Sequence, residues 1–159
     1  GLCGEMPVAP PWLIFRVLNW LVLLGAVVAV LGWTATKISQ NETAVAANFP
    51  VAAVDFLEAN GLAEARGYNS YNWGGYLIWR GLPVFVDGRA DVYGDDFLFY
   101  YRDAFDVAEN WQEPLDEFDV AYVLMERGTP LTTILVASGQ WKQLYEDDLA
   151  QIFIRAESP

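Results

Sequence analysis

The feature that most constrains this chain is an apolar run near its N-terminus. Residues 17–36, VLNWLVLLGAVVAVLGWTAT, contain no charged side chain. A helix of about twenty such residues matches the roughly 30 Å hydrocarbon core of a bilayer. Trp12 and Trp20 lie at one end and Trp33 at the other, where aromatic anchors lie in membrane helices. The run therefore predicts one transmembrane helix over residues 12–37, with the lipid bilayer as its partner.

Two other interpretations of the apolar run are less consistent with its composition. A helix buried in a globular protein usually carries a polar face, whereas Asn19 is the one strongly polar interruption here. A secretory signal would have a shorter apolar region and would be removed from the mature protein. The flanking charges do not choose an orientation, because Arg16 precedes the run and Lys37 follows it.

Small and polar residues within the run indicate a possible helix contact. Asn19, Gly25 and Gly32 are of the types that mediate packing between helices in lipid. Other membrane-protein subunits or helices are therefore predicted partners.

Charge and residue usage exclude several function classes. The formal net charge is −12, and residues 38–159 carry 20 acidic against 7 basic side chains. Such a field repels nucleic acid and anionic membrane surfaces, so no nucleic acid is predicted as a partner. The chain has no histidine and one cysteine, Cys3. An intrachain disulfide, a Ser-His-Asp triad and most zinc sites are thereby excluded. We predict no catalytic residue, no metal site and no cofactor.

The organisation that follows is an N-terminal tail (1–11), the transmembrane helix (12–37), a polar linker (38–49) and an α/β domain (50–157). Apolar runs bounded by turn residues predict the strands of this domain. They lie at residues 65–71, 82–86 and 120–125, and a hairpin pairs 141–145 with 151–155. Helices are expected to begin at Pro50, Asn72, Asp95 or Asp96, Trp111 and Thr129-Pro130, and the last of them to end at Gly139. Because helices and strands alternate, we predict a small layered α/β domain with a mostly parallel sheet ending in an antiparallel hairpin.

Residues 67–96 are the densest stretch of unusual residues, with six of the thirteen glycines. Four side chains at its start are candidates to stack on or hydrogen-bond a sugar, so a glycan is a candidate ligand. The competing interpretation is that these side chains fill space between the glycine-containing turns of the stretch itself. The four candidates are Asn69, Tyr71, Trp73 and Tyr76.

The end of the same stretch, DGRADVYGDD, places four carboxylates around one arginine. Asp87, Arg89 and Asp91 are ligand-binding candidates, because Asp87 follows an expected strand and α/β sheets bind ligands at strand ends. The spacing does not fit a calcium loop of the EF-hand type. The alternative is an internal network in which Arg89 neutralises Asp87 and Asp91.

The order of these motifs resembles one protein family. It is similar to the extracytoplasmic C-terminal region of bacterial polytopic membrane proteins of the GT-C-like, dolichyl-phosphate-mannosyltransferase type. The likeness covers residues 12–155, with the apolar run matching the last membrane helix of the family. The motifs that carry it are Phe49-Pro50, Asp55-Phe56-Leu57, Asn69-x-Tyr71, Trp73-Gly74-Gly75-Tyr76-Leu77, Val86-Asp87-Gly88-Arg89-x-Asp91, Tyr93-Gly94, Trp111, Leu115, Trp141, Tyr145-x-Asp147-Asp148 and Ile152-Phe153.

The resemblance implies a single-pass membrane location with the C-terminal domain on the extracytoplasmic side. In that family the catalytic acidic residues lie in an early loop between other membrane helices, and this chain has no counterpart of that loop. The chain is then either a fragment or a single-span relative. We therefore expect a non-catalytic accessory or scaffolding subunit of a membrane complex. The alternative is the C-terminal domain of a polytopic GT-C-like glycosyltransferase, which positions a glycan or lipid-linked sugar for a catalytic site elsewhere.

Overall fold

The computed structural model describes residues 11–156, so the predicted N-terminal tail and Cys3 lie almost wholly outside the described part. The chain divides into two units, residues 1–44 and residues 45–159. The division falls within the predicted linker.

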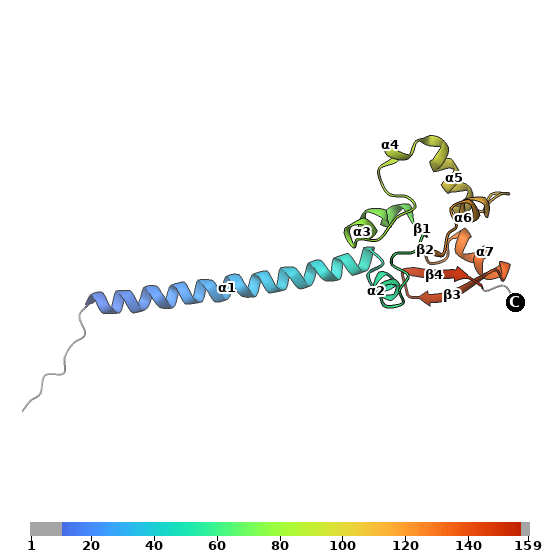
Figure 1. Cartoon of the computed structure of the whole chain (residues 1–159). Coiled ribbons are helices and arrows are strands. Elements are labelled where there is room, and N and C mark those ends of the chain that lie inside the picture. Colours follow the sequence, from blue (N-terminus) through green and yellow to red (C-terminus); the bar gives the residue numbers. More distant parts are fainter. Residues whose placement is uncertain (1–10, 157–159) are drawn as a thin grey trace, which may run out of the picture. The chain divides into compact units, whose positions relative to one another are not determined.

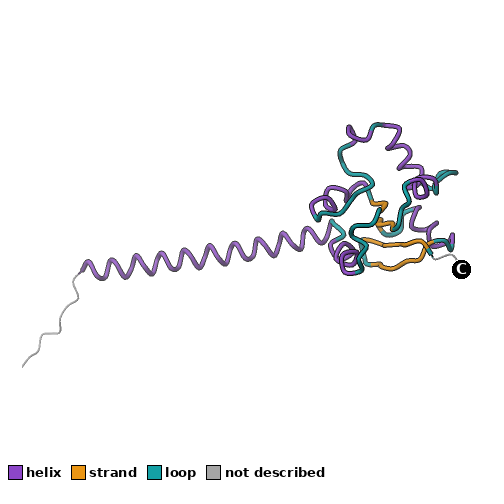
Figure 2. Tube along the Cα trace, viewed as in Figure 1, coloured by secondary structure: helices purple, strands orange, loops and turns teal. Residues whose placement is uncertain are grey.

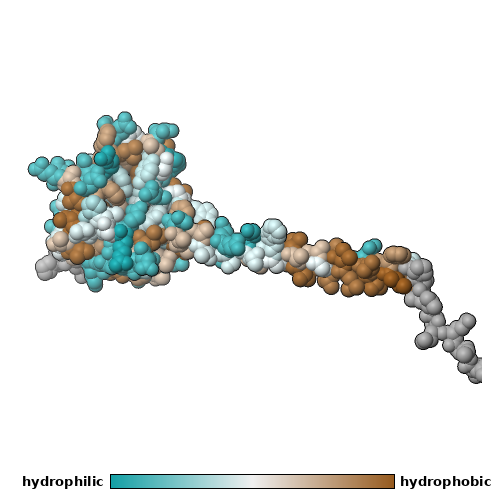
Figure 3. All heavy atoms as spheres, turned by 180° about the vertical axis from the view of Figure 1, so that it is seen from behind, coloured by the Kyte–Doolittle hydropathy of each residue, from teal (hydrophilic) through white to brown (hydrophobic). Residues whose placement is uncertain are grey.

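Helix α1 runs from Pro11 to Asn48, so the predicted linker residues continue the helix instead of interrupting it. From Trp12 to Ala44 every side chain is exposed, including Trp20 at 67% and Trp33 at 69%. On the face seen in Figure 3, apolar residues cover the N-terminal part of α1 and more hydrophilic ones follow. Within the described residues, α1 is the one helix long and apolar enough to cross a membrane.

The threonine hydroxyls near the end of the apolar part of α1 donate hydrogen bonds to backbone carbonyls of the same helix. The Thr34 hydroxyl donates to the Val30 carbonyl at 2.9 Å, and the Thr36 hydroxyl donates to the Trp33 carbonyl at 2.7 Å. A hydroxyl bonded in this way can enter an apolar medium without an unpaired donor. Residues 37–43 are polar apart from Ile38, and Lys37 Nζ donates to Gln40 Oε1 at 3.2 Å.

The second unit contains a four-stranded sheet in the order β1-β2-β4-β3 (Figures 1 and 2). Its strands are β1 (Gly67–Asn69), β2 (Tyr122–Glu126), β3 (Trp141–Glu146) and β4 (Ala150–Arg155). Strands β1 and β2 are parallel, whereas β2–β4 and β3–β4 are antiparallel. The α/β class and the terminal hairpin are confirmed, but the prediction of a mostly parallel sheet is correct for one pair alone.

The missing parallel strand is the apolar run at residues 82–86, which is not a strand in the structure. Pro83 has no backbone donor for a ladder. The Asn69 side chain makes the hydrogen bonds that a neighbouring strand would otherwise make. Its Oδ1 accepts from the Phe85 N–H at 2.8 Å, and its Nδ2 donates to the Val86 carbonyl at 2.8 Å. One amide side chain therefore fastens this segment beside β1, and no backbone pairing is needed.

Helices cover both faces of the sheet. On one face, Tyr68, Val123 and Phe153 are cross-strand neighbours and pack against the first helical layer. On the other face, Leu124 and Ile152 pack against the second layer. The first layer comprises α5 (Asp95–Phe105), α6 (Glu113–Glu117) and α7 (Pro130–Ser138), and the second comprises α2 (Val51–Ala59) and α3 (Gly74–Trp79).

The ends of α7 follow the predicted local chemistry, whereas three helix starts differ, among them that of α6, which begins at Glu113 and not at Trp111. Thr129 caps α7, its hydroxyl accepting from the Thr132 N–H at 3.3 Å, and Gly139 ends the helix with φ of 68°. Ser70, not Asn72, caps the short 3-10 helix η1 (Tyr71–Trp73) that precedes α3. Gly94, not Asp95 or Asp96, is the N-cap of α5, and it follows the short helix α4 (Ala90–Tyr93).

Candidate functional site

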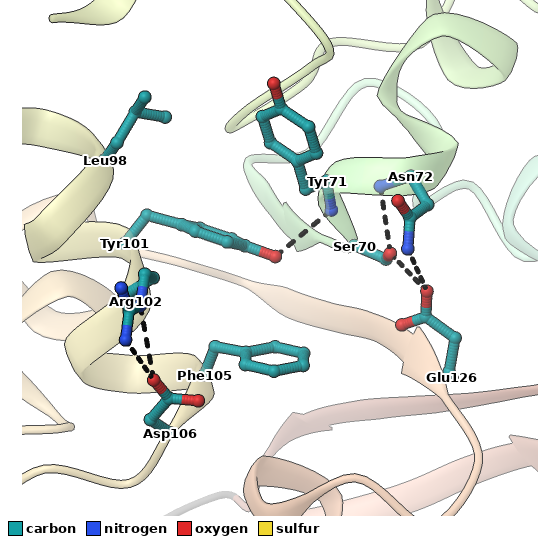
Figure 4. A pocket seen from close by; sticks show the side chains of 9 residues that line it. All are labelled: Ser70, Tyr71, Asn72, Leu98, Tyr101, Arg102, Phe105, Asp106 and Glu126. Atoms are coloured by element: carbon teal, nitrogen blue, oxygen red, sulfur yellow. Dashed lines mark hydrogen bonds and ion pairs between the residues drawn. The ribbon is translucent and has the colours of Figure 1, made fainter. Parts of the chain in front are cut away.

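A pocket of about 410 Å³ lies at the carboxyl ends of the parallel strands β1 and β2. This is the edge at which α/β sheets usually bind ligands. Three parts of the chain contribute to its wall: the turn after β1, one side of α5, and the last residue of β2 (Figure 4). The lining residues are Ser70, Tyr71, Asn72, Leu98, Tyr101, Arg102, Phe105, Asp106 and Glu126.

The polar part of the pocket is centred on the Glu126 carboxylate. Its Oε1 accepts hydrogen bonds from the Ser70 hydroxyl and from Asn72 Nδ2, the latter at 3.4 Å. Ser70 is held in turn, because its backbone N–H donates to the Leu124 carbonyl at 3.1 Å. Oε2 of Glu126 is buried and has no hydrogen-bond partner among the described residues. Figure 4 shows this oxygen on the side of the carboxylate that faces Phe105.

The aromatic wall is rigid because Tyr101 is held at both ends. Its hydroxyl accepts from the Tyr71 backbone N–H at 3.1 Å, and its carbonyl accepts from the Tyr68 hydroxyl at 2.8 Å. The Tyr101 ring stacks on Tyr68 at 5.0 Å and on Phe105 at 6.4 Å between centroids. Burial raises the pKa of the Tyr101 phenol, which is therefore neutral at physiological pH.

At the rim, Arg102 and Asp106 form an exposed ion pair one helical turn apart, with 3.2 Å between Nη2 and Oδ2. Exposed pairs of this kind contribute about 0.3–0.5 kcal/mol, so they are easily rearranged. Counting Glu126, the pocket carries two carboxylates and one guanidinium. Its formal charge is therefore negative.

The candidate residues named from the sequence separate into three groups. Tyr71 lines the pocket. Trp73 and Tyr76 are buried in the core on the other face of the sheet, and Asn69 is buried where it fastens residues 85 and 86. The space-filling interpretation therefore accounts for Trp73, Tyr76 and Asn69.

Asp87, Arg89 and Asp91 form a different cluster. The Arg89 guanidinium binds Asp87 with Nε to Oδ1 at 2.9 Å and Nη2 to Oδ2 at 2.6 Å. The Arg89 backbone N–H and the Tyr93 hydroxyl add bonds at 2.9 and 3.0 Å. These hydrogen bonds, chiefly those from Arg89, hold the pKa of the buried Asp87 carboxyl well below its usual range. Asp91 is exposed and makes no ion pair with Arg89 in the described structure.

Gly74 explains why this cluster lies against α3. A Cβ at Gly74 would lie 2.3 Å from the Val86 carbonyl oxygen and 2.6 Å from Asp87 Cα, whereas one at Gly75 would meet nothing within 4 Å. The first glycine of the Trp-Gly-Gly-Tyr motif is thus required for the close approach of two backbones. Many of the conspicuous residues in the 67–96 stretch therefore make contacts within that stretch.

Sequence reasoning missed most of the pocket. Ser70 and Asn72 alternate with the named Asn69 and Tyr71. Glu126 is the charged last residue of an otherwise buried strand, which is a usable signal for a site at a strand end. The α5 residues gave no such signal, because an aromatic pair four residues apart is typical of any core-facing helix. Among residues 11–156, no group of three or more Cys, Asp or Glu side chains could hold a metal ion.

Comparisons with known proteins provide no relative: no family model, curated protein or solved structure matches the chain.

Proposed function

We propose that this chain is a membrane-anchored accessory subunit, with α1 spanning the bilayer and the α/β unit acting as a non-catalytic extracytoplasmic module of a membrane complex. The observation that carries the proposal is α1 itself. Its apolar side chains are exposed on every side over residues 12–36. A contiguous apolar surface of that size is stable in lipid or against other apolar helices and not in water.

The length of α1 supports the same proposal. Residues 12–36 extend about 37 Å at 1.5 Å per residue, enough for the hydrocarbon core with a modest tilt. The largely polar turns of residues 37–43 then lie outside the hydrocarbon. The extracytoplasmic side is proposed from the family resemblance, because Arg16 and Lys37 balance each other.

Two variants test the anchoring step. Leu24→Arg places a charge at the centre of the apolar run, at a cost of about 2.5–3.5 kcal/mol for insertion. Gln40→Arg adds the same charge in the polar part of α1. We expect the unmodified chain and Gln40→Arg to stay in membranes through an alkaline carbonate wash, and Leu24→Arg to be depleted. Release of the unmodified chain by the wash would contradict the proposal.

The accessory role and the side of the membrane need separate measurements. We expect added protease to digest the α/β unit in spheroplasts without lysis, and native mass spectrometry to detect the chain in an assembly with other protein subunits. Protection of the unit until lysis would contradict the extracytoplasmic placement. A chain that carries only lipid under mild extraction would contradict the accessory role.

The second candidate is glycan positioning as the terminal domain of a GT-C-like glycosyltransferase. Tyr71 favours it, since its ring lines a pocket that also contains hydroxyl and amide groups. The denatured mass of the polypeptide from its native membrane separates the candidates. A mass near 17.8 kDa supports the single-span subunit, and a mass several times larger supports the transferase.

A further inference from the structure

We propose that the pocket at the carboxyl ends of β1 and β2 binds an organic cation, a primary ammonium or guanidinium group attached to an apolar body. The proposal does not depend on the membrane role, because every lining residue belongs to the unit of residues 45–159. It rests on the state of one carboxylate, on the rings around it and on the local charge.

The carboxylate is that of Glu126. Oε1 already accepts two side-chain hydrogen bonds, while Oε2 is buried with no partner among residues 11–156. A buried carboxylate oxygen without a donor is unfavourable, so the site is incomplete by one donor. A cationic N–H group in the pocket supplies the opposite charge, and it supplies the missing hydrogen bond once the Glu126 carboxylate, whose terminal torsion is soft, turns Oε2 toward the ligand.

The aromatic groups select an ammonium or guanidinium ligand over a simple metal cation. Tyr71, Tyr101 and Phe105 present rings to the same pocket, and ring faces attract organic cations while covering apolar surface. A metal ion would instead need several oxygen ligands around it. The described structure provides no cluster of three acidic side chains for that purpose.

The nearby charges disfavour an anion. Arg102 is the one basic residue that lines the pocket, and its guanidinium is bound to Asp106. With Glu126 and Asp106 both present, the pocket favours a positive ligand. At about 410 Å³ it has room for a compact molecule with one ring or a short chain.

The test is a titration of the full chain in nanodiscs of zwitterionic lipid, which do not themselves collect cations. The probe is phenethylammonium, with 2-phenylethanol as its neutral counterpart and phenylacetate as its anionic counterpart. Binding is followed by ligand-observed NMR. We expect phenethylammonium to bind at least about tenfold more tightly than either counterpart, since a hydrogen bond to a charged group is worth that much or more.

Variants locate the binding. Glu126→Gln is expected to weaken phenethylammonium at least about tenfold, whereas Glu109→Gln, which removes an exposed carboxylate outside the pocket, leaves the affinity within twofold. Tyr71→Leu keeps Glu126 and its hydrogen bonds, removes one ring and is expected to weaken binding about threefold. Thermal unfolding shows whether Glu126→Gln folds. If it does not, Tyr71→Leu still tests whether the probe binds in this pocket.

Three results would overturn the proposal. One is equal affinity for phenethylammonium and 2-phenylethanol. Another is affinity for the ammonium probe that neither Glu126→Gln nor Tyr71→Leu changes. The third is tighter binding of methyl mannoside than of the ammonium probe, which would assign the pocket to a neutral sugar. Failure of any of these tests leaves the carbonate and protease results on α1 untouched.

Discussion

Two carboxylates in the α/β unit, Asp87 and Glu126, differ in how many of their oxygens accept hydrogen bonds. Both oxygens of Asp87 are occupied by donors from Arg89 and Tyr93. Glu126 uses one oxygen and keeps the other buried and unbound among the described residues. The Asp87 cluster is closed and needs nothing further for stability. The Glu126 cluster is incomplete, and it lies in a pocket.

The residues that stand out in the sequence are not the ones whose side chains are free to contact a ligand. The Asp-Gly-Arg and Trp-Gly-Gly-Tyr motifs stand out in the sequence, and their side chains are used within the fold. Glu126 belongs to no conspicuous motif, and it lines the pocket. We therefore expect mutations in the closed Asp87 cluster to reduce stability and mutations in the incomplete Glu126 cluster mainly to affect binding.

The largest expected effect is at Gly74. Gly74→Ala places a methyl group against the backbone of residues 86 and 87, where the Cβ would lie 2.3 Å from a carbonyl oxygen. We expect a loss of about 3 kcal/mol in the free energy of unfolding, measured by urea denaturation of the detergent-solubilised chain. Gly75→Ala is the control, since its Cβ meets nothing within 4 Å. Equal effects at the two positions would show that α3 does not pack against the Asp87 segment in this way.

The next effect is at Asp87. Asp87→Asn removes the charge that Arg89 binds and leaves a buried amide facing two donors, so we expect a loss of about 2 kcal/mol in unfolding free energy. Asp91→Asn is the matched control, because Asp91 is exposed and forms no ion pair with Arg89 in the described part. If Asp91→Asn lost as much unfolding free energy as Asp87→Asn, Asp91 would also have to interact with Arg89, which contradicts a closed Asp87–Arg89 pair.

The pH dependence of stability should follow from the same carboxylate. The folded pKa of Asp87 is depressed, so its contribution is fully present above the unfolded pKa and declines as the pH falls toward the folded value. Below about pH 4, the ordinary value of an aspartate, unfolding free energy should fall with a steeper slope in the unmodified chain than in Asp87→Asn. Parallel acid slopes would mean that Asp87 is not stabilised in the folded state.

The smallest effect on stability is expected at Glu126. Glu126→Gln keeps an acceptor for Ser70 and Asn72. It removes a buried oxygen that has no donor and adds an amide N–H group in its place, and because these two effects oppose each other, unfolding free energy should change by less than about 0.5 kcal/mol. Thermal unfolding without ligand measures this. A loss as large as that of Asp87→Asn would mean that Glu126 is a structural carboxylate like Asp87.

Sequence patterns predicted the elements whose signals are local. The apolar run predicted α1, Thr129-Pro130 and Gly139 predicted the ends of α7, and two alternating runs predicted the β3–β4 hairpin. The run at residues 82–86 has the composition of a buried strand, but its partner is the Asn69 side chain, and no local pattern reveals that. Without this strand, one of the three strand pairs is parallel and two are antiparallel.

The candidate site was harder to predict for the same reason. Its wall combines residues 70–72, 98–106 and 126, which only the parallel pairing of β1 with β2 and the packing of α5 bring together. Tyr71 was identified because it lies inside a conspicuous motif. The position of Glu126 at the end of a buried strand is a sequence signal, but only the structure shows that its second oxygen is buried without a donor.

The most direct test of the contrast is a carbon NMR measurement of the two carboxyl groups in the full chain, with and without phenethylammonium. We predict that the Glu126 carboxyl resonance shifts on saturation with the probe, while the Asp87 resonance stays unchanged because its oxygens are already occupied. A shift at Asp87, or none at Glu126 when the probe is bound, would contradict the assignment of one closed and one open carboxylate.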